Sequence, residues 1–447
     1  MKSKIVITLL ILIIILCVTS CTAITKPMQN GEIKTDSNIE DVESTEKIID
    51  SENNKYDTIK NTYDSLDKIG GRLIGTDENY LFAKELKMYM EENFKNTEIF
   101  VQPYSISLTE KYEVTISSGN DNITFNNEDS ICKYINKSKI NETDVILTDS
   151  LNNLNEQSEY IFFTNDESLI ESSKKLDNIC LSLLIVDKIY LGQNAIKVKT
   201  DMPTIMNIDG ITAEKLADFV DKKIELNINL QNKEIELENI YAIIRGKESK
   251  NAIVITSHYD TTTAKGENYS KGAIDNGSGI SLNLDLLKKF YNSNTNLNYD
   301  IVFSFVNSEE GFLLKTTSGG MQISNLMSQQ YENVLNINLD CIGEKDIEVL
   351  SYGFDGDINK DMLNDIIASE ANDFISLEKV DYYTSDNLNF NNSLYFYNFD
   401  YHGDNRAIHT ENDKIDKIDI DKLEKISNIL YEVIKQILQI DASSLFI

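Results

Sequence analysis

A short apolar run, Ala252–Thr256, constrains the fold of this chain more than any other stretch. Its β-branched residues follow one another without a polar interruption, which is typical of a strand buried on both faces of a parallel sheet. Polar residues come directly afterwards, with His258 and Asp260 one residue apart. In open α/β sheets, functional groups gather at the carboxyl ends of such strands. We therefore expect a functional site where this strand ends.

The same alternation of apolar strands and amphipathic helices continues along the chain. The patterns predict the strands Ile240–Arg245, Ile301–Val306, Val334–Leu339 and Ser393–Phe399, and the helices Gly279–Tyr291 and Asp419–Leu438. Strands that alternate with helices favour a sheet covered on both faces. The sequence thus predicts the α/β class, as a three-layer α/β/α fold around a mixed, mostly parallel sheet.

Between residues 110 and 230 the pattern changes to short β runs, with one helix-like piece near Thr212–Phe219. We interpret this stretch as an inserted, mainly-β domain. A main domain is expected over residues 56–109 and 231–447, preceded by a signal peptide at 1–20 and a flexible acidic tether at 21–55.

The N-terminus has the features of a secretory signal. Lys2 and Lys4 precede a 14-residue apolar run, Ile5–Val18, which is too short to span a bilayer comfortably. The run ends in Val-Thr-Ser-Cys, which resembles the lipobox of bacterial lipoproteins. That resemblance implies cleavage before Cys21, acylation of its thiol, and a lipid-anchored protein on the extracytoplasmic face of the cell membrane. The alternative is an ordinary secretory signal with an incidental cysteine.

The net charge argues against one class of partner. The chain carries 42 basic and 73 acidic residues, for a formal charge of −31. Nucleic acid requires a basic surface, so we expect no nucleic-acid partner.

Ionisable residues follow four of the predicted strands, and another precedes a predicted helix. These residues are His258, Asp260, Asp275, Glu309, Glu310, Asp340 and His409. Carboxylates that face a core are unfavourable unless a cation or a hydrogen bond satisfies them. Two histidines with several carboxylates suit zinc, with cobalt or manganese also possible. A bridging carboxylate between two ions is the usual co-catalytic arrangement.

The order of these motifs resembles the M28 family of zinc aminopeptidases. The motifs are His258-x-Asp260, Gly272-Ala273-x-Asp275-Asn276-x-Ser278-Gly279, Glu309-Glu310, Asn338-x-Asp340 and Ile408-His409-Thr410-x-x-Asp413. Ser385-Asp386 and the turn Gly71–Thr76 also match the family. The resemblance spans about Asp57 to Leu438, with an interruption, and the ordered set is far more specific than any single piece.

The resemblance implies a role for each matched metal ligand. His258 and Asp340 would hold one zinc ion, Glu310 and His409 a second, and Asp275 would bridge the two.

The same resemblance implies the chemistry. Glu309 would be the general base that takes a proton from the attacking water, and Asp260 would orient His258 through its other ring nitrogen. The expected reaction is the release of N-terminal amino acids from peptides.

Some positions depart from the family pattern. The stretch Gly311–Lys315 replaces the usual Gly-Leu and Gly-Ser that follow the glutamate pair, which puts substrate positioning in doubt. Ile408 stands where some members have a tyrosine that stabilises the oxyanion. Tyr383, Tyr397 or Tyr401 could substitute for it, and the sequence does not choose among them.

Two alternative functions remain open at this point. Glutaminyl cyclases share the architecture with one zinc ion, but tryptophans wall their pockets and this chain has no Trp. A non-catalytic zinc-binding surface protein would keep the ligands without the activity.

The insertion resembles, around Pro203–Ile208, the protease-associated domain of many family members. An unrelated β insertion is the alternative.

Overall fold

The computed structural model describes residues 58–447 apart from 96, 127–129, 187–196, 199–201, 248–249, 264–268, 294–296, 311–316, 371–375, 382 and 399–406. The predicted signal peptide, Cys21 and the tether lie outside the described residues. Within that part of the chain, no helix is both long and apolar enough to cross a membrane.

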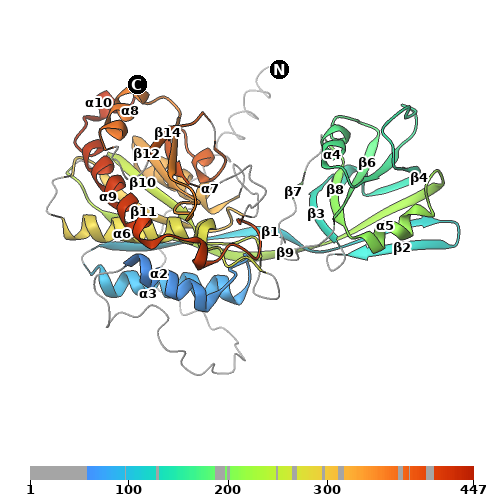
Figure 1. Ribbon diagram of the computed structural model, residues 1–447, viewed down its shortest axis with the longest axis horizontal. Helices are drawn as coiled ribbons and strands as arrows, with labels where there is room; N and C mark the ends of the chain where they lie inside the picture. The colour runs from blue at the N-terminus through green and yellow to red at the C-terminus, as the bar shows by residue number, and fades with distance from the viewer. Residues whose placement is uncertain are drawn as a thin grey trace, which may run out of the picture. The chain divides into compact units, whose positions relative to one another are not determined.

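One sheet forms the centre of the main domain, in the order β14-β13-β15-β12-β10-β11-β9-β1 (Figure 1). Its strands are β1 (Glu98–Ser118), β9 (Lys223–Ile244), β10 (Asn251–His258), β11 (Asp300–Val306), β12 (Asn333–Leu339), β13 (Val349–Asp355), β14 (Ser376–Lys379) and β15 (Ser393–Tyr397). The central strands β11, β10, β12 and β15 are parallel, while β9 joins β11 in antiparallel fashion. Their carboxyl ends therefore meet at one edge of the sheet.

Helices cover both faces of this sheet. They are α2 (Thr58–Ile69), α3 (Asp77–Asn93), α6 (Ser278–Asn292), α7 (Gly319–Gln330), α8 (Lys360–Ser369), α9 (Ile420–Ile437) and α10 (Ala442–Leu445). Ile253 and Ile255 of β10 pack with α2, α3, α6, α8 and α9, whereas Val254 packs with α7 on the opposite face. Side chains of a strand alternate between faces, so this division confirms the predicted three-layer α/β/α fold.

Side-chain caps begin two of these helices. Thr76 caps α3 by accepting a hydrogen bond from the Asn79 amide, and Asp419 caps α9 through the Lys422 amide. The apolar stripe of α9 is buried throughout, as its helical spacing predicts. Short turns of other helix types cover Lys137–Lys139, Ala273–Gly277, Asp386–Asn389 and Ile415–Lys417.

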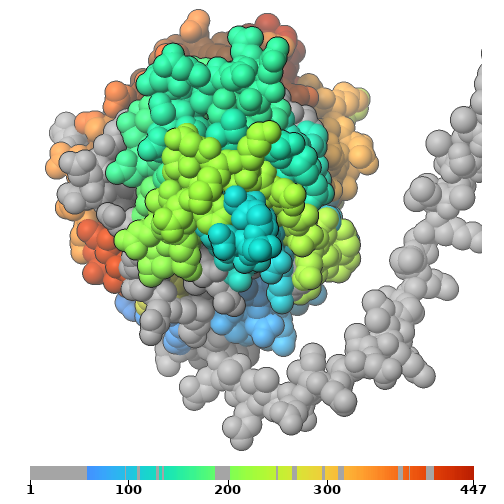
Figure 2. Space-filling view, turned by 90° about the vertical axis from the view of Figure 1, so that its right-hand side faces the viewer, coloured from blue at the N-terminus to red at the C-terminus, as the bar shows by residue number. Residues whose placement is uncertain are grey.

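The insertion has its own core. Its elements are β2 (Asp121–Asn126), β3 (Ser130–Ile135), β4 (Asn141–Thr148), β5 (Tyr160–Thr164), α4 (Glu167–Ser173), β6 (Ile179–Ile185), β7 (Lys197–Val198), β8 (Thr204–Ile208) and α5 (Gly210–Ala217). Strands β4, β5, β6 and β8 are parallel to one another, and α5 packs beside β2 on the face seen in Figure 2. Most of the regular structure of the insertion is therefore β-strand, with two short helices, α4 and α5, added to it.

The insertion is joined to the main domain by a two-stranded ribbon of β1 and β9. The two strands pair in antiparallel register from Glu98–Ile243 to Ser117–Glu225, with one irregularity between Thr109 and Lys111. Both therefore run without a break through the boundaries predicted at residues 110 and 230. The sequence indicates only the ends of β9 as strands, because several residues in its middle are exposed and polar.

Candidate metal centre

The first cluster forms at the carboxyl end of β10. His258 is the last residue of this strand and is buried. Its Nε2 atom lies 3.1 Å from Oδ1 of Asp275 and 3.4 Å from Oδ1 of Asp340, which directly follows β12. Because β10 and β12 are parallel neighbours, their ends bring these side chains together.

A second cluster shares one residue with the first. His409 Nε2 lies 2.9 Å from Oδ2 of Asp275 and 3.2 Å from Oε2 of Glu310. Asp275 thus directs one carboxylate oxygen toward each histidine. Burial alone would raise the pKa of Asp275, but the close approach of the His258 and His409 imidazoles outweighs burial and holds this pKa below its ordinary value.

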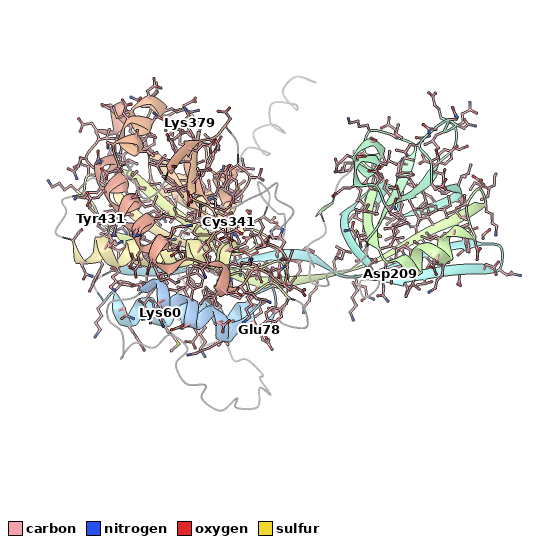
Figure 3. The ribbon with its side chains drawn as sticks, viewed as in Figure 1. Lys60, Glu78, Asp209, Cys341, Lys379 and Tyr431 are labelled. Carbon is pink, nitrogen blue, oxygen red and sulfur yellow. The ribbon has the colours of Figure 1, made fainter. Side chains whose placement is uncertain are left out.

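These residues fit a divalent metal ion. Within each cluster, one ligand atom from each of the three residues lies within 4.8 Å of the others. Nε2 of His258 and Oδ1 of Asp340 are buried and have no hydrogen-bond partner among the described residues. Such orphaned polar atoms are unfavourable in a protein interior, and a cation would satisfy both. Cys341, directly after Asp340, is buried within the main domain (Figure 3).

Glu309 lies beside the clusters and belongs to neither of them. Its Oε2 is 3.9 Å from Nε2 of His258, and its side chain is largely buried. Burial raises the pKa of Glu309 well above its ordinary value, which favours proton uptake. Its neighbour Glu310 joins the second cluster, so the turn after β11 separates the two side chains as the predicted roles require.

Asp260 fixes this turn. Its carboxylate accepts hydrogen bonds from the main-chain amides of Glu309, at 3.1 Å, and Glu310, at 3.0 Å. The predicted contact with His258 is made differently. Nδ1 of His258 lies 3.2 Å from the main-chain oxygen of Asp260 and 3.6 Å from its carboxylate. The carboxylate therefore positions the glutamate pair, and the main chain is the nearer partner of the imidazole.

Arg72 holds the two loops that carry His258, Asp260 and Asp275. It is fully buried and donates hydrogen bonds to the main-chain oxygens of Gly70, Tyr259, Lys271 and Gly272. The guanidinium also lies 5.4 Å from the centre of the Phe82 ring. Burial lowers the pKa of Arg72 to about 10, so its charge persists at neutral pH. The motif Gly71–Thr76 indicated this turn but not the role of Arg72.

Asp413 supports the Asp275 loop from the other side. Its Oδ1 accepts the Ile274 amide at 2.6 Å, and its Oδ2 accepts the Asp275 amide at 3.3 Å. The spacing of four residues from His409 marked this aspartate in the sequence, without showing that it binds a loop 138 residues away.

Tyr383, one of the three open tyrosines, contacts a predicted ligand. Its hydroxyl donates to Oδ2 of Asp340 at 3.1 Å, and its ring stacks on Tyr397 with centroids 4.3 Å apart. Tyr401 lies outside the described residues. Asp386 of the Ser-Asp pair is buried next to the same centre, where burial raises its pKa to about 7.

A comparison with protein families identifies the core of this site. Residues 239–434 match the sequence model of peptidase family M28. This part of the chain belongs to that family. The M28 segment includes all five predicted metal ligands together with Glu309 and Asp260. Family and site together support metal-dependent hydrolysis of peptide bonds, while the individual roles of the residues stay predictions.

Solved structures share the fold of most of the chain. A zinc aminopeptidase from Bacillus subtilis is 19% identical, with a TM-score of 0.63, and the match covers 88% of this chain and 97% of that one. An aminopeptidase from Aneurinibacillus is 17% identical, with a TM-score of 0.55 and coverage of 85% and 93%. An M28 peptidase precursor from Shewanella amazonensis is 14% identical, with a TM-score of 0.53 and coverage of 86% and 94%. A search of curated proteins found no match.

Replacing Arg72 tests its role as the support of the M28 site. Arg72→Lys keeps the charge, but an ammonium cannot reach the four carbonyls that the planar guanidinium binds. Each buried carbonyl left without a hydrogen bond lowers the free energy of unfolding by about 1–3 kcal/mol. We expect the free energy of unfolding, measured by denaturant titration, to fall by at least that amount. Unchanged stability would contradict the role given to Arg72.

Proposed function

We propose that this protein is a zinc aminopeptidase that uses two metal ions and Glu309 as its general base. The observation that carries the proposal is the position of the Asp275 carboxylate, which directs one oxygen toward His258 and the other toward His409. A bridging carboxylate of this kind is the usual link in co-catalytic sites. The fold likeness to two aminopeptidases supports selectivity for the peptide N-terminus.

The ligands divide between two ions in this proposal. His258 and Asp340 would hold one zinc ion, Glu310 and His409 would hold the other, and Asp275 would contact both. Zinc supplies Lewis acidity, which lowers the pKa of water and polarises a carbonyl group.

Proton transfer falls to Glu309. Its carboxylate takes a proton from the attacking water and returns it to the nitrogen of the leaving amine. Two features support this role, since Glu309 is not needed as a ligand and burial raises its pKa. Asp260 keeps the base at its place by binding the amides of Glu309 and Glu310.

We also propose that the mature protein is anchored to the outer face of the cell membrane through a lipid on Cys21. The support is the order of positive charge, apolar run and lipobox-like residues at the N-terminus. The substrate would then be a peptide outside the cytoplasm.

The bridging role of Asp275 is tested by metal content. Asp275→Asn removes the charge that both sites share, so we expect the bound zinc to fall from two ions per chain to one or none. Elemental analysis of the desalted protein measures this ratio. The exposed Asp361 of α8 provides the control Asp361→Asn, which should keep both ions. Two ions in Asp275→Asn would exclude the shared site.

The base is tested by Glu309→Gln, which keeps the size of the side chain but cannot accept the proton. We expect kcat on aminoacyl anilides to fall by about 100-fold or more, with the zinc content unchanged. Activity equal to wild type would disprove the role of Glu309. Cyclisation of an N-terminal glutamine without hydrolysis would instead identify a glutaminyl cyclase, and zinc binding without either reaction a binding protein.

The lipid anchor is tested by Cys21→Ser in cells. We expect the variant to leave the membrane fraction and to lose incorporation of a labelled fatty acid. Cys17→Ser, four residues earlier in the same segment, is the matched control and should stay anchored. Persistent labelling of Cys21→Ser would rule out Cys21 as the lipid site.

A further inference from the structure

Strand β1 places a tyrosine against the turn that carries Glu309. Tyr104 is buried, and its hydroxyl donates to the main-chain oxygen of Asn307 at 3.0 Å. The hydroxyl oxygen of Tyr104 also lies 3.0 Å from Oγ of Ser308. Burial raises the pKa of Tyr104 well above its ordinary value, so the hydroxyl keeps the proton that it donates. Tyr104 therefore contacts the two residues immediately before Glu309.

The turn needs such support because its backbone is strained. Ser308 has a φ of +61°, a left-handed conformation that L-residues other than Asn and Asp rarely adopt. Its amide donates to Oδ1 of Asn307 at 2.9 Å, and its Oγ accepts the Gly319 amide at 3.2 Å. A conformation of this kind persists only where its surroundings determine it.

Strand β9 holds the same turn from beside β1. Asn239 is buried and accepts the Asn307 amide at 3.1 Å. Its side-chain nitrogen donates to Oε1 of Gln102 and to the main-chain oxygen of Gly319, each at 2.9 Å. Gln102 and Asn239 are direct partners in the β1–β9 register, so this contact joins the two strands where they meet the turn.

Asn307 completes the network toward the metal ligands. Its side-chain nitrogen donates to Oδ1 of Asn79 and to the hydroxyl of Tyr259, each at 2.9 Å. Tyr259 lies between His258 and Asp260 in the chain. A buried network in which every member is hydrogen-bonded specifies one geometry, because any displacement leaves a polar group unsatisfied.

We infer that Tyr104 and Asn239 are positioning residues for Glu309, which act through the main chain of Asn307 and Ser308. Neither side chain contacts the two metal clusters directly. The inference rests on the proposed function for Glu309, whose carboxylate must be held within a fraction of an ångström of its productive place. The two strands at the root of the insertion thus also fix the turn that carries the base.

Tyr104→Phe tests this positioning, because it removes one hydroxyl and keeps the buried ring. Tyr112→Phe is a closely matched control on the same strand. The Tyr112 hydroxyl is also buried, donates to a main-chain oxygen at 2.6 Å and lies 3.0 Å from a serine Oγ, but both partners belong to Ser130 of the insertion.

For Tyr104→Phe, we expect kcat on an aminoacyl anilide to fall about 10-fold, while KM changes by less than about two-fold and the zinc content is unchanged. Tyr112→Phe should keep the wild-type kcat. If both variants keep the wild-type kcat, or if both lose kcat only in proportion to thermal stability, Tyr104 is merely structural and the inference is wrong.

A second measurement does not depend on activity. Hydrogen exchange at residues 307–310, followed by mass spectrometry, reports how firmly the turn is held. We expect faster exchange there in Tyr104→Phe than in wild type, and no change in Tyr112→Phe. If wild type hydrolyses no peptide substrate but exchange still responds to Tyr104→Phe, the proposed function fails and the structural coupling stands. Unchanged exchange at 307–310 in an active enzyme overturns the positioning role.

Discussion

The carboxylate of Asp275 lies between two histidines, and much of the surrounding structure serves to keep it there. A short buried carboxylate can hold two imidazoles only if its main chain is fixed. Arg72 binds the carbonyls before the Asp275 turn, and Asp413 binds the amides of Ile274 and Asp275 from the other side. The buried guanidinium of Arg72 and the buried carboxyl group of Asp413 thus hold opposite polar groups of one loop.

The sheet explains why the remaining residues converge. Parallel strands β10, β11 and β12 end at the same edge, so His258, the glutamate pair and Asp340 come close together although 82 residues separate His258 from Asp340 in the numbering. The strand ends alone do not orient the two glutamates after β11, since adjacent side chains would point to opposite sides on an extended strand. The left-handed conformation of Ser308, after β11, and the carboxylate of Asp260, after β10, fix the turn that orients them.

The sequence predicts the local part of this site well and the distant part poorly. Apolar strands followed by ionisable residues reveal the strand ends, and an ordered set of motifs reveals the family. Tyr104, Asn239 and Asn307 leave no such signal, because a buried tyrosine or asparagine is identified only by partners from other strands. The sequence predicts β9 only at its two ends, since a strand that is exposed in its middle lacks the continuous apolar pattern of a buried strand.

The ribbon of β1 and β9 also separates changes in the insertion from changes in the residues that hold the Glu309 turn. Its entering and leaving strands are hydrogen-bonded neighbours at Ser107 and Glu234, so the ends of the insertion are only one strand spacing apart. Any unit whose termini meet at that spacing, down to a two-residue hairpin turn, would close the ribbon without moving Tyr104 or Asn239. The length and content of the insertion can thus vary outward from the Ser107–Glu234 pair. Tyr104 and Asn239, on the other side of this pair, are constrained because they contact the turn that carries Glu309.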